Sequence, residues 1–289
     1  MKTTFIHLMA TAAITFVPTF GMAQQQPTEN PRGVYKLIEI IDKTGTRISA
    51  PFDQYKICTD SVTLMLAMQG SRFSLGKNDS KVFNYTGEEP DANDTTATRI
   101  FDSNAEHFTQ KWWSTYPFHL YFPNNDWCTE FYESGKYSEN AKTILDALMS
   151  PNATDRKCPF IGTWRMVGMM DELRNTKQQL KKLREDDRYK ANIGYIIFTP
   201  NCAIMYSNRN RGGSVELVGY NGKKEVFMAH FNSQSGFTGG HRNAIIWLSK
   251  DCFAMEVQLD GYRTDYEIWE RVTDSTPLFN RIASQYVVH

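Results

Sequence analysis

The sequence predicts an all-β protein with minor helices, arranged as two tandem antiparallel domains of one kind. The first observation is an internal repeat. Each copy begins with a similar motif, Gly33-Val34-Tyr35-Lys36 in the first and Gly162-Thr163-Trp164-Arg165 in the second, 129 residues apart (from 33 to 162). Each copy ends with an aromatic-Glu pair, Tyr132-Glu133 and Trp269-Glu270, 137 residues apart (from 132 to 269). The second is a series of short alternating runs bounded by Gly, Asn and Asp, typical of an antiparallel meander. The internal repeat is longer than the roughly 20–50 residues of a solenoid unit and has the length of a small domain.

Composition and charge narrow the class further. The 289 residues carry 32 Lys and Arg against 32 Asp and Glu, so the formal net charge is zero. No global field would recruit nucleic acid, and we expect no nucleic-acid partner. The aromatic content of 13% argues against a disordered chain.

The first 23 residues have the pattern of a secretory signal peptide. Lys2 gives a positive start, residues 5–20 are mostly apolar, and Gly21-Met22-Ala23 offers small residues where a signal peptidase cuts. We expect cleavage after Ala23, a polar disordered leader over residues 24–32, and export to the periplasm or the exterior of a bacterial cell. An uncleaved anchor is the alternative. No later segment approaches the roughly 18 apolar residues of a membrane span, so we expect no integral membrane segment after cleavage.

The first domain is expected over residues 33–149. Strands are predicted at 34–41, 55–68 with a break at Asp60-Ser61, 72–75, 81–85, 107–114, 118–122 and 128–134, and a loop from Glu88 to Thr98. Ser138 fits the N-cap of a closing helix whose apolar stripe is Ile144, Leu145 and Leu148. Ser150-Pro151-Asn152 ends that helix and begins a linker over residues 150–158.

The second domain is expected over residues 159–289 and repeats the plan. Strands are predicted at 163–170, 195–206, 226–231, 244–248, 253–259 and 266–272. Pro277 suits the first turn of a closing helix with Leu278, Phe279 and Ile282 on its apolar face. Residues 171–190 form an insertion rich in good helix formers. We expect a helix on the outside of the domain, and a lid over the mouth of a barrel is the alternative.

Five cysteines follow the predicted signal: Cys58, Cys128, Cys158, Cys202 and Cys252. Their spacings match no zinc pattern, and the odd count leaves at least one thiol free or intermolecular. Export would permit a disulfide between Cys58 and Cys128 or between Cys202 and Cys252. Small buried thiols that form no disulfide are the alternative.

One constellation in the second copy resembles the lipocalin, or wider calycin, family. Gly162 and Trp164 form a Gly-x-Trp at the start of a first strand, and Arg271 ends the last strand. The resemblance implies an up-and-down barrel whose closed end is plugged by the Trp, with the Arg packed across the indole. In the first copy Gly33 matches, Tyr35 replaces the Trp, and the position of the Arg falls on a serine.

The resemblance therefore implies two tandem lipocalin-like antiparallel up-and-down barrels, each with a C-terminal helix. The chain is most similar to secreted bacterial lipocalin-like domains of unassigned function. Some other antiparallel sandwich or barrel, in which Trp164 is an ordinary core residue, is the alternative fold.

The function expected from this fold is non-enzymatic binding of a small apolar or amphipathic ligand in the second barrel. Adaptable apolar residues at alternate strand positions are the candidate lining: Met166, Phe198, Met205, Phe227, Trp247, Met255 and Tyr266. The same residues would fill a solid core equally well. In that case we expect a structural or protein-interaction module of the cell envelope. An exposed aromatic patch at Trp112 or Trp113 would support this alternative.

Signs of catalysis are lacking in the sequence. The six histidines show no ligand spacing, and no phosphate loop, dinucleotide fingerprint or nucleophile elbow occurs. His230 reads as an ordinary strand residue and His241 as a turn residue. Asp186-Asp187 and Glu88-Glu89 fall in polar runs typical of solvated surface. We expect no catalytic residue, metal or cofactor, and only His and carboxylate groups converging in one pocket would favour an enzyme.

Overall fold

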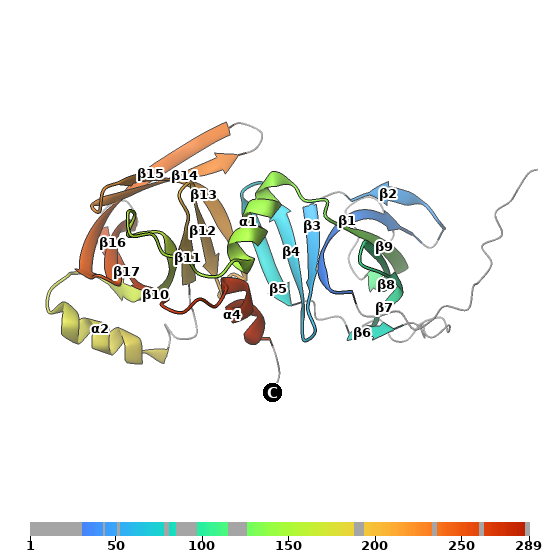
Figure 1. Cartoon of the computed structure of the whole chain (residues 1–289), viewed down its shortest axis with the longest axis horizontal. Coiled ribbons are helices and arrows are strands. Elements are labelled where there is room, and N and C mark those ends of the chain that lie inside the picture. The colour runs from blue at the N-terminus through green and yellow to red at the C-terminus, as the bar shows by residue number, and fades with distance from the viewer. Residues whose placement is uncertain are drawn as a thin grey trace, which may run out of the picture.

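The structure, a computed structural model, describes residues 31–42, 44–50, 53–77, 81–84, 97–114, 126–187, 194–232, 236–259 and 263–286 (Figure 1). The predicted signal peptide, most of the leader and the predicted strand at 118–122 lie outside these residues. Trp112 and Trp113 belong to a described strand, but their side chains are not among those described.

The second half of the chain forms a closed antiparallel barrel of eight strands. They are β10 (Gly162–Met170), β11 (Gly194–Phe198), β12 (Cys202–Ser207), β13 (Gly212–Asn221), β14 (Glu225–Asn232), β15 (Gly236–Ser249), β16 (Cys252–Leu259) and β17 (Arg263–Arg271). Each pairs with the next along the chain, and β17 returns to pair with β10. The predicted up-and-down barrel is confirmed here, although β13 was not anticipated.

The first half is an open sheet among the described residues. Its strands are β1 (Gly33–Ile41), β2 (Arg47–Ser49), β3 (Asp53–Cys58), β4 (Thr63–Gln69), β5 (Arg72–Lys77), β6 (Lys81–Asn84), β7 (Ala97–Ser103), β8 (His107–Ser114) and β9 (Asp126–Ser134). They pair in the order β6-β7-β8-β9-β1-β3-β4-β5, and β2 adds to the end of β1.

Two details of this sheet depart from the prediction. A closed first barrel is not shown, so the tandem pair of barrels is observed only in its second member. β6 and β7 pair in parallel, whereas an up-and-down barrel is antiparallel throughout. Most of the expected loop from Glu88 to Thr98 lies outside the described residues, and its last two positions belong to β7, which begins at Ala97.

The strand registers show that the two halves share one plan. Tyr35 lies opposite Ser134 in the β1–β9 ladder, and Trp164 lies opposite Arg271 in the β10–β17 ladder, as the sequence repeat predicted. Both ladders shift register at equivalent places, Leu37/Glu39 and Met166/Gly168. The opening glycines have φ values of +124° and +127°. The duplication is therefore visible in the backbone.

The halves meet through an apolar core that neither contains alone. The first half contributes the outer face of β3 to β5: Tyr55, Ile57, Leu64, Leu66, Met68, Phe73 and Leu75. The second half contributes the outer face of β11 and β12: Tyr195, Ile197, Cys202, Ile204 and Tyr206. All five residues of β11 are buried because one face lines the barrel and the other faces this shared core.

A backbone ladder also joins the two halves. Gly212, Gly213 and Ser214 of β13 pair with β5, so the barrel wall continues into the first sheet. Gly212 permits this junction, since a Cβ there would lie 2.4 Å from the carbonyl oxygen of Phe73 on β5. A side chain at this position would force the strands apart.

Three helices complete the described fold. Ser138 caps α1 (Glu139–Met149) through its hydroxyl, which accepts from the Ala141 amide at 3.3 Å, as predicted. Helix α4 (Leu278–Ser284) follows Pro277 and packs with α1 at the junction of the halves (Figure 1). Within the described residues, no helix is long and apolar enough to cross a membrane.

The predicted helical insertion is α2 (Thr176–Glu185). Its Leu180 and Leu183 pack on outward-facing residues of the barrel wall, including Ala254 and Ile268. Figure 1 shows α2 along the outer side of β10, β16 and β17. The helix thus lies on the outside of the wall, as expected for the insertion, and here it is not a lid.

Candidate functional site

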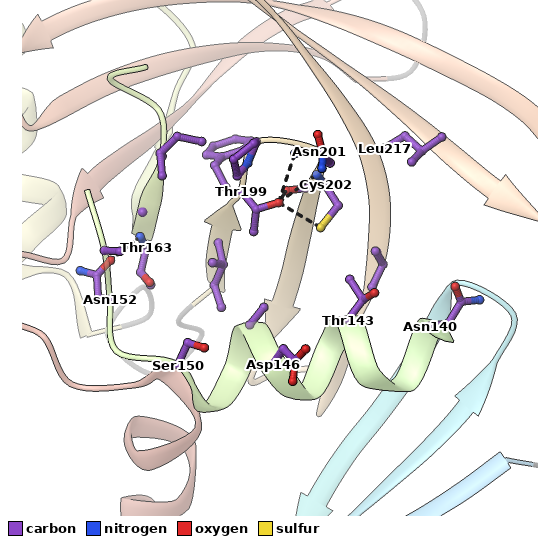
Figure 2. Close-up of a pocket in the computed structure, with 18 of the residues that line it drawn as sticks. Asn140, Thr143, Asp146, Ser150, Asn152, Thr163, Thr199, Asn201, Cys202 and Leu217 are labelled. Atoms are coloured by element: carbon purple, nitrogen blue, oxygen red, sulfur yellow. Dashed lines mark hydrogen bonds between the residues drawn. The ribbon is translucent and has the colours of Figure 1, made fainter. Parts of the chain in front are cut away.

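A groove of about 680 Å³ lies where α1 faces the outer wall of the barrel (Figure 2). One side is a stripe of α1, and the other is formed by β11, β12, β13 and the turn between β11 and β12. The segment from Ser150 to Ala153 and the start of β10 close one end. Cavities of this size are typical of small-molecule sites.

The floor of the groove is apolar because it continues the outer face of the barrel. Ile197, Val215 and Leu217 project from three neighbouring strands, and Ile161 adds to them from the linker side. Ile197 is buried, whereas Leu217 is 48% exposed. A large aliphatic side chain left this open in a pocket offers contact area to a ligand.

The helical side of the groove is polar. Glu139, Asn140, Thr143 and Asp146 lie at helical spacing on the stripe that faces the cavity. The opposite stripe of α1 is buried in the shared core, so the helix is held firmly in place. The two carboxylates are the only acidic side chains among the described residues lining the groove, and no Lys or Arg lines it.

A tight turn shapes the third side. The Thr199 hydroxyl accepts from the Cys202 amide at 3.0 Å, donates to the Cys202 carbonyl at 2.9 Å and lies 3.1 Å from its thiol (Figure 2). Asn201 projects from the same turn. Because Thr199 is occupied by the backbone, Asn201 is the more available polar group.

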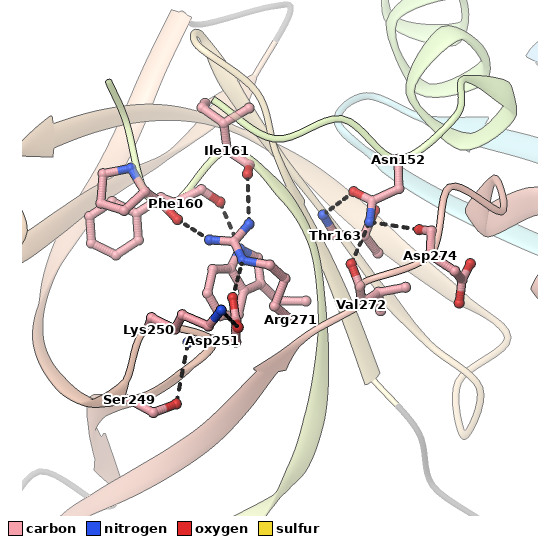
Figure 3. Close-up of polar contacts among 12 residues, drawn as sticks. Asn152, Phe160, Ile161, Thr163, Ser249, Lys250, Asp251, Arg271, Val272 and Asp274 are labelled. Atoms are coloured by element: carbon pink, nitrogen blue, oxygen red, sulfur yellow. Dashed lines mark hydrogen bonds and ion pairs between the residues drawn. The ribbon is translucent and has the colours of Figure 1, made fainter. Parts of the chain in front are cut away.

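The linker end of the groove is fixed by one side chain. Asn152 accepts from the Thr163 amide at 2.9 Å and donates to the carbonyls of Val272 at 2.5 Å and Asp274 at 3.1 Å (Figure 3). The first and last strands of the barrel are thus joined to the linker. Asn152 also lines the groove, so its position depends on the closure of the barrel.

Beside this end, the barrel is plugged as the sequence predicted. The Arg271 guanidinium lies 4.1 Å from the ring centroid of Trp164, whose indole donates to the Phe160 carbonyl at 2.6 Å. Arg271 also donates to the carbonyls of Ile161 at 3.0 Å and of Pro159, and its Nε lies 3.2 Å from Asp251 (Figure 3). The cation–π contact is therefore held by hydrogen bonds on every side.

Gly162 makes room for this arrangement. A Cβ at Gly162 would lie 2.9 Å from the Ala153 carbonyl oxygen and 3.1 Å from Arg271 Nη1. Its φ of +127° also disfavours any other residue. Steric crowding and the positive φ therefore both favour glycine at this position of the Gly-x-Trp motif.

Of the seven residues expected to line a ligand site in the second barrel, five have side chains inside the barrel. Met166, Phe198, Met205, Trp247 and Met255 belong to the core inside the barrel. Phe227 is 37% exposed, because Val226 and Met228 on either side of it point inward. Tyr266 packs on the outer wall with the α2 contacts. These two assignments to the interior are wrong.

Sequence reasoning missed a buried polar network inside the first half. Glu130 Oε2 accepts from the Tyr132 hydroxyl at 2.9 Å and from Gln110, and it lies 3.7 Å from Lys56 Nζ. Gln54 donates to the Tyr132 oxygen at 2.9 Å. All five side chains are buried, so each charge depends on its partner.

Burial governs the titration of this network. Burial lowers the pKa of Lys56, and the nearby Glu130 carboxylate partly offsets this by raising it. Burial also raises the pKa of Tyr132 well above its ordinary value. Lys56 Nζ also lies 5.1 Å from the Tyr132 ring centroid. The available signal was Lys56 alternating with Tyr55 and Ile57 in β3, but alternation alone places a charge on the solvent side.

All five cysteines are free thiols, and neither within-domain disulfide forms. Cys158 is partly exposed, and the other four are buried. His241 lies on β15 rather than in a turn, while the His230 side chain is outside the described set. Among the described residues, no cluster of three or more His, Cys, Asp and Glu side chains could hold a metal ion.

Comparison with known proteins does not assign this chain to a family. The chain matches no protein-family model, and no curated protein is significantly similar to it. The lipocalin-like assignment therefore stays a prediction, supported by the barrel and by the Trp164–Arg271 contact.

Proposed function

We propose that the protein is an exported, non-enzymatic binding protein that takes a small amphipathic molecule into the groove between α1 and the barrel wall. The observation that carries this proposal is the groove itself, with an apolar floor and convergent polar side chains. The ligand site expected in the second barrel is thereby moved from its interior to its outer face.

Packing at the closed end of the barrel supports this shift. The Phe160 ring centroid lies 5.3 Å from that of Trp247, 5.5 Å from that of Tyr220 and 6.0 Å from that of Phe253. Trp164 and Phe253 are 4.6 Å apart. Aromatic rings at these separations fill the space that a ligand would need.

The charge of the groove restricts the ligand. Glu139 and Asp146 face it, and Asp146 is partly neutralised by Lys142, whose Nζ lies 2.5 Å from it. An anionic ligand would meet carboxylates without a compensating cation in the lining. We therefore assign the groove to neutral or cationic amphipathic molecules.

A dye titration tests the site directly. Nile red, which is uncharged, should bind the wild-type protein with enhanced emission, and an anionic naphthalene sulfonate dye should bind more weakly. Replacing Thr143 by Trp would fill the groove from α1 and weaken Nile red binding at least about tenfold.

Met149→Trp is the matched control, because Met149 is an exposed residue of the same helix that does not line the groove. A second pair is Leu217→Asp against Ile246→Asp, two exposed aliphatic residues of which only Leu217 lies in the groove. Equal dye affinity within either pair, with unchanged circular dichroism, would rule out the groove as the site.

The alternative class, a protein-interaction module of the envelope, is favoured by the exposure of Leu217 in an open groove. Native mass spectrometry of the protein purified from its producing cells separates the two. A reproducible small-molecule adduct supports the binding protein. A clean apo mass together with a stoichiometric protein partner supports the module.

A further inference from the structure

The wall of the barrel opens between two neighbouring strands. β15 and β16 pair from Ile245 opposite Met255 to Ser249 opposite Cys252, and no described pair extends this ladder beyond Ile245. The continuing residues of β15 pair only with β14, and those of β16 only with β17. Figure 1 shows β14 and β15 running on together away from the rest of the barrel.

A cavity of about 540 Å³ occupies this opening. The pairs that would come next in the ladder, Ala244 with Glu256 and Asn243 with Val257, line its two sides. His241, Arg242 and Glu225 complete the described lining. The cavity is thus bounded by two separated strand edges, and it shares no lining residue with the interdomain groove.

The cavity presents both signs of charge without joining them. Among the described residues, Arg242 and Glu256 form no ion pair with each other or with any other side chain, although both line this cavity. Glu225 adds a second carboxylate, which accepts from Asn221 at 3.1 Å. Opposite charges that face one opening without contact can be satisfied together by a ligand that carries both.

One buried group points to the same conclusion. Asn243 is 5% exposed, and its side-chain nitrogen has no hydrogen-bond partner. Leaving such a donor unsatisfied is costly, so it calls for an acceptor from the cavity that it lines. A peptide carbonyl that reaches between the separated strand edges would supply that acceptor, because the side chains of Asn243 and Arg242 leave opposite faces of β15.

We propose that this opening is a second binding site, which takes a small zwitterion of the short-peptide class. Arg242 would hold the carboxylate, Asn243 would donate to the peptide carbonyl, and Glu256 with Glu225 would hold the ammonium group. The separated strand edges add backbone groups that a peptide bond can pair with. Ala244 and Val257 provide apolar contact for a side chain.

The test uses leucyl-leucine and its two singly blocked forms, with isothermal titration calorimetry for affinity and ligand-observed NMR for weak binding. The dipeptide should bind, and both the N-acetyl form and the C-terminal amide should bind about tenfold more weakly, since each loses one charged contact. Glu256→Gln should weaken the amide but not the N-acetyl form, and Arg242→Gln should do the reverse.

Glu185→Gln and Arg209→Gln are the matched controls, because both residues are exposed and neither lines the cavity. The proposal is overturned if leucyl-leucine does not bind, if the blocked forms bind as well as the dipeptide, or if control and site variants lose affinity equally. Binding of the N-acetyl form alone would also overturn it, since that result describes an anion site.

Discussion

In the first half of the chain Tyr35 lies opposite a serine, whereas in the second half Trp164 lies opposite Arg271. The Tyr35 hydroxyl bonds to the Arg32 carbonyl at 3.0 Å, and the Trp164 indole bonds to the carbonyl four residues before it. Each ring is thus anchored to the segment that precedes its strand. The backbone plan persists while the side chains that complete it differ.

The interiors differ more than the closed ends do. The barrel of the second half holds an aromatic core around Phe160 and Trp164, whereas the first half holds a buried Lys56–Glu130 pair. An aromatic core is stabilised by the apolar surface area that it buries, and it tolerates local repacking. A buried ion pair, by contrast, is stable only when both of its charged members are present. The two halves should therefore respond differently to single substitutions.

The largest expected effect is in the first half. Replacing Glu130 by Leu leaves Lys56 charged and unpaired in the interior and removes the acceptor of Tyr132. We expect a loss of about 3–5 kcal/mol in the free energy of unfolding, measured by urea denaturation.

The double variant Lys56→Met with Glu130→Leu serves as its control. Removing both charges should cost less than removing Glu130 alone, because no uncompensated ion remains. Additive losses would show that the two side chains act independently and that the network is not a unit.

The next effect compares the closed ends. Arg271→Met removes the cation–π contact and the hydrogen bonds to the Pro159 and Ile161 carbonyls, and should lower the unfolding free energy by about 2–3 kcal/mol. Ser134→Ala, at the equivalent position of the first half, should change it by under about 0.5 kcal/mol. Similar losses at both positions, compared in one urea titration series, would contradict the proposed divergence.

The junction between the halves gives a smaller change. Gly212→Ala places a Cβ against the Phe73 carbonyl of β5 and should cost about 1–3 kcal/mol. Hydrogen exchange should speed up in β5 and β13 before the rest of the barrel. Gly219→Ala on the same strand is the control, since a Cβ there has no contact closer than 3.9 Å.

The smallest effect is a pH dependence in the second half. Burial raises the pKa of the Glu267 carboxyl, which the Trp269 indole lowers in opposition. As pH rises, Glu267 therefore ionises in the unfolded chain before it ionises in the folded protein. The stability that the protonated carboxyl contributes is fully present below the unfolded pKa and is lost as pH rises through the folded pKa.

Glu267→Gln keeps an acceptor for Trp269 without this ionisation. The variant should match the wild type near pH 4 and exceed it at neutral pH by under about 1 kcal/mol, in thermal unfolding followed at both values. A wild-type advantage that grows toward neutral pH would show that the carboxylate is stabilised instead.

Several features could be predicted because their signals are local. The Ser138 cap, the stop at Ser150 and the outward helical insertion each depend on a few adjacent residues. The Trp164–Arg271 contact could be placed because the repeat fixed which strand ends lie opposite each other.

The interior of the first half could not be predicted for the opposite reason. In β3 the apolar residues Tyr55 and Ile57 face outward into the shared core, and Gln54 and Lys56 face inward. Alternation shows that a strand has two faces but does not show which face is covered by another unit. Phe227 and Tyr266 were assigned to the wrong face because neighbouring or outer-wall residues are equally apolar.

The sequence by itself determined the β class, the duplication, the helix ends and the residues of the second closed end, all of which follow from periodicity and from spacing along the chain. Only the tertiary structure decided the shared core, the interdomain groove, the buried ion pair and the opening between β15 and β16. Each of these arises from surfaces brought together across the fold, and such contacts depend on the docking of complete sheets rather than on any local pattern.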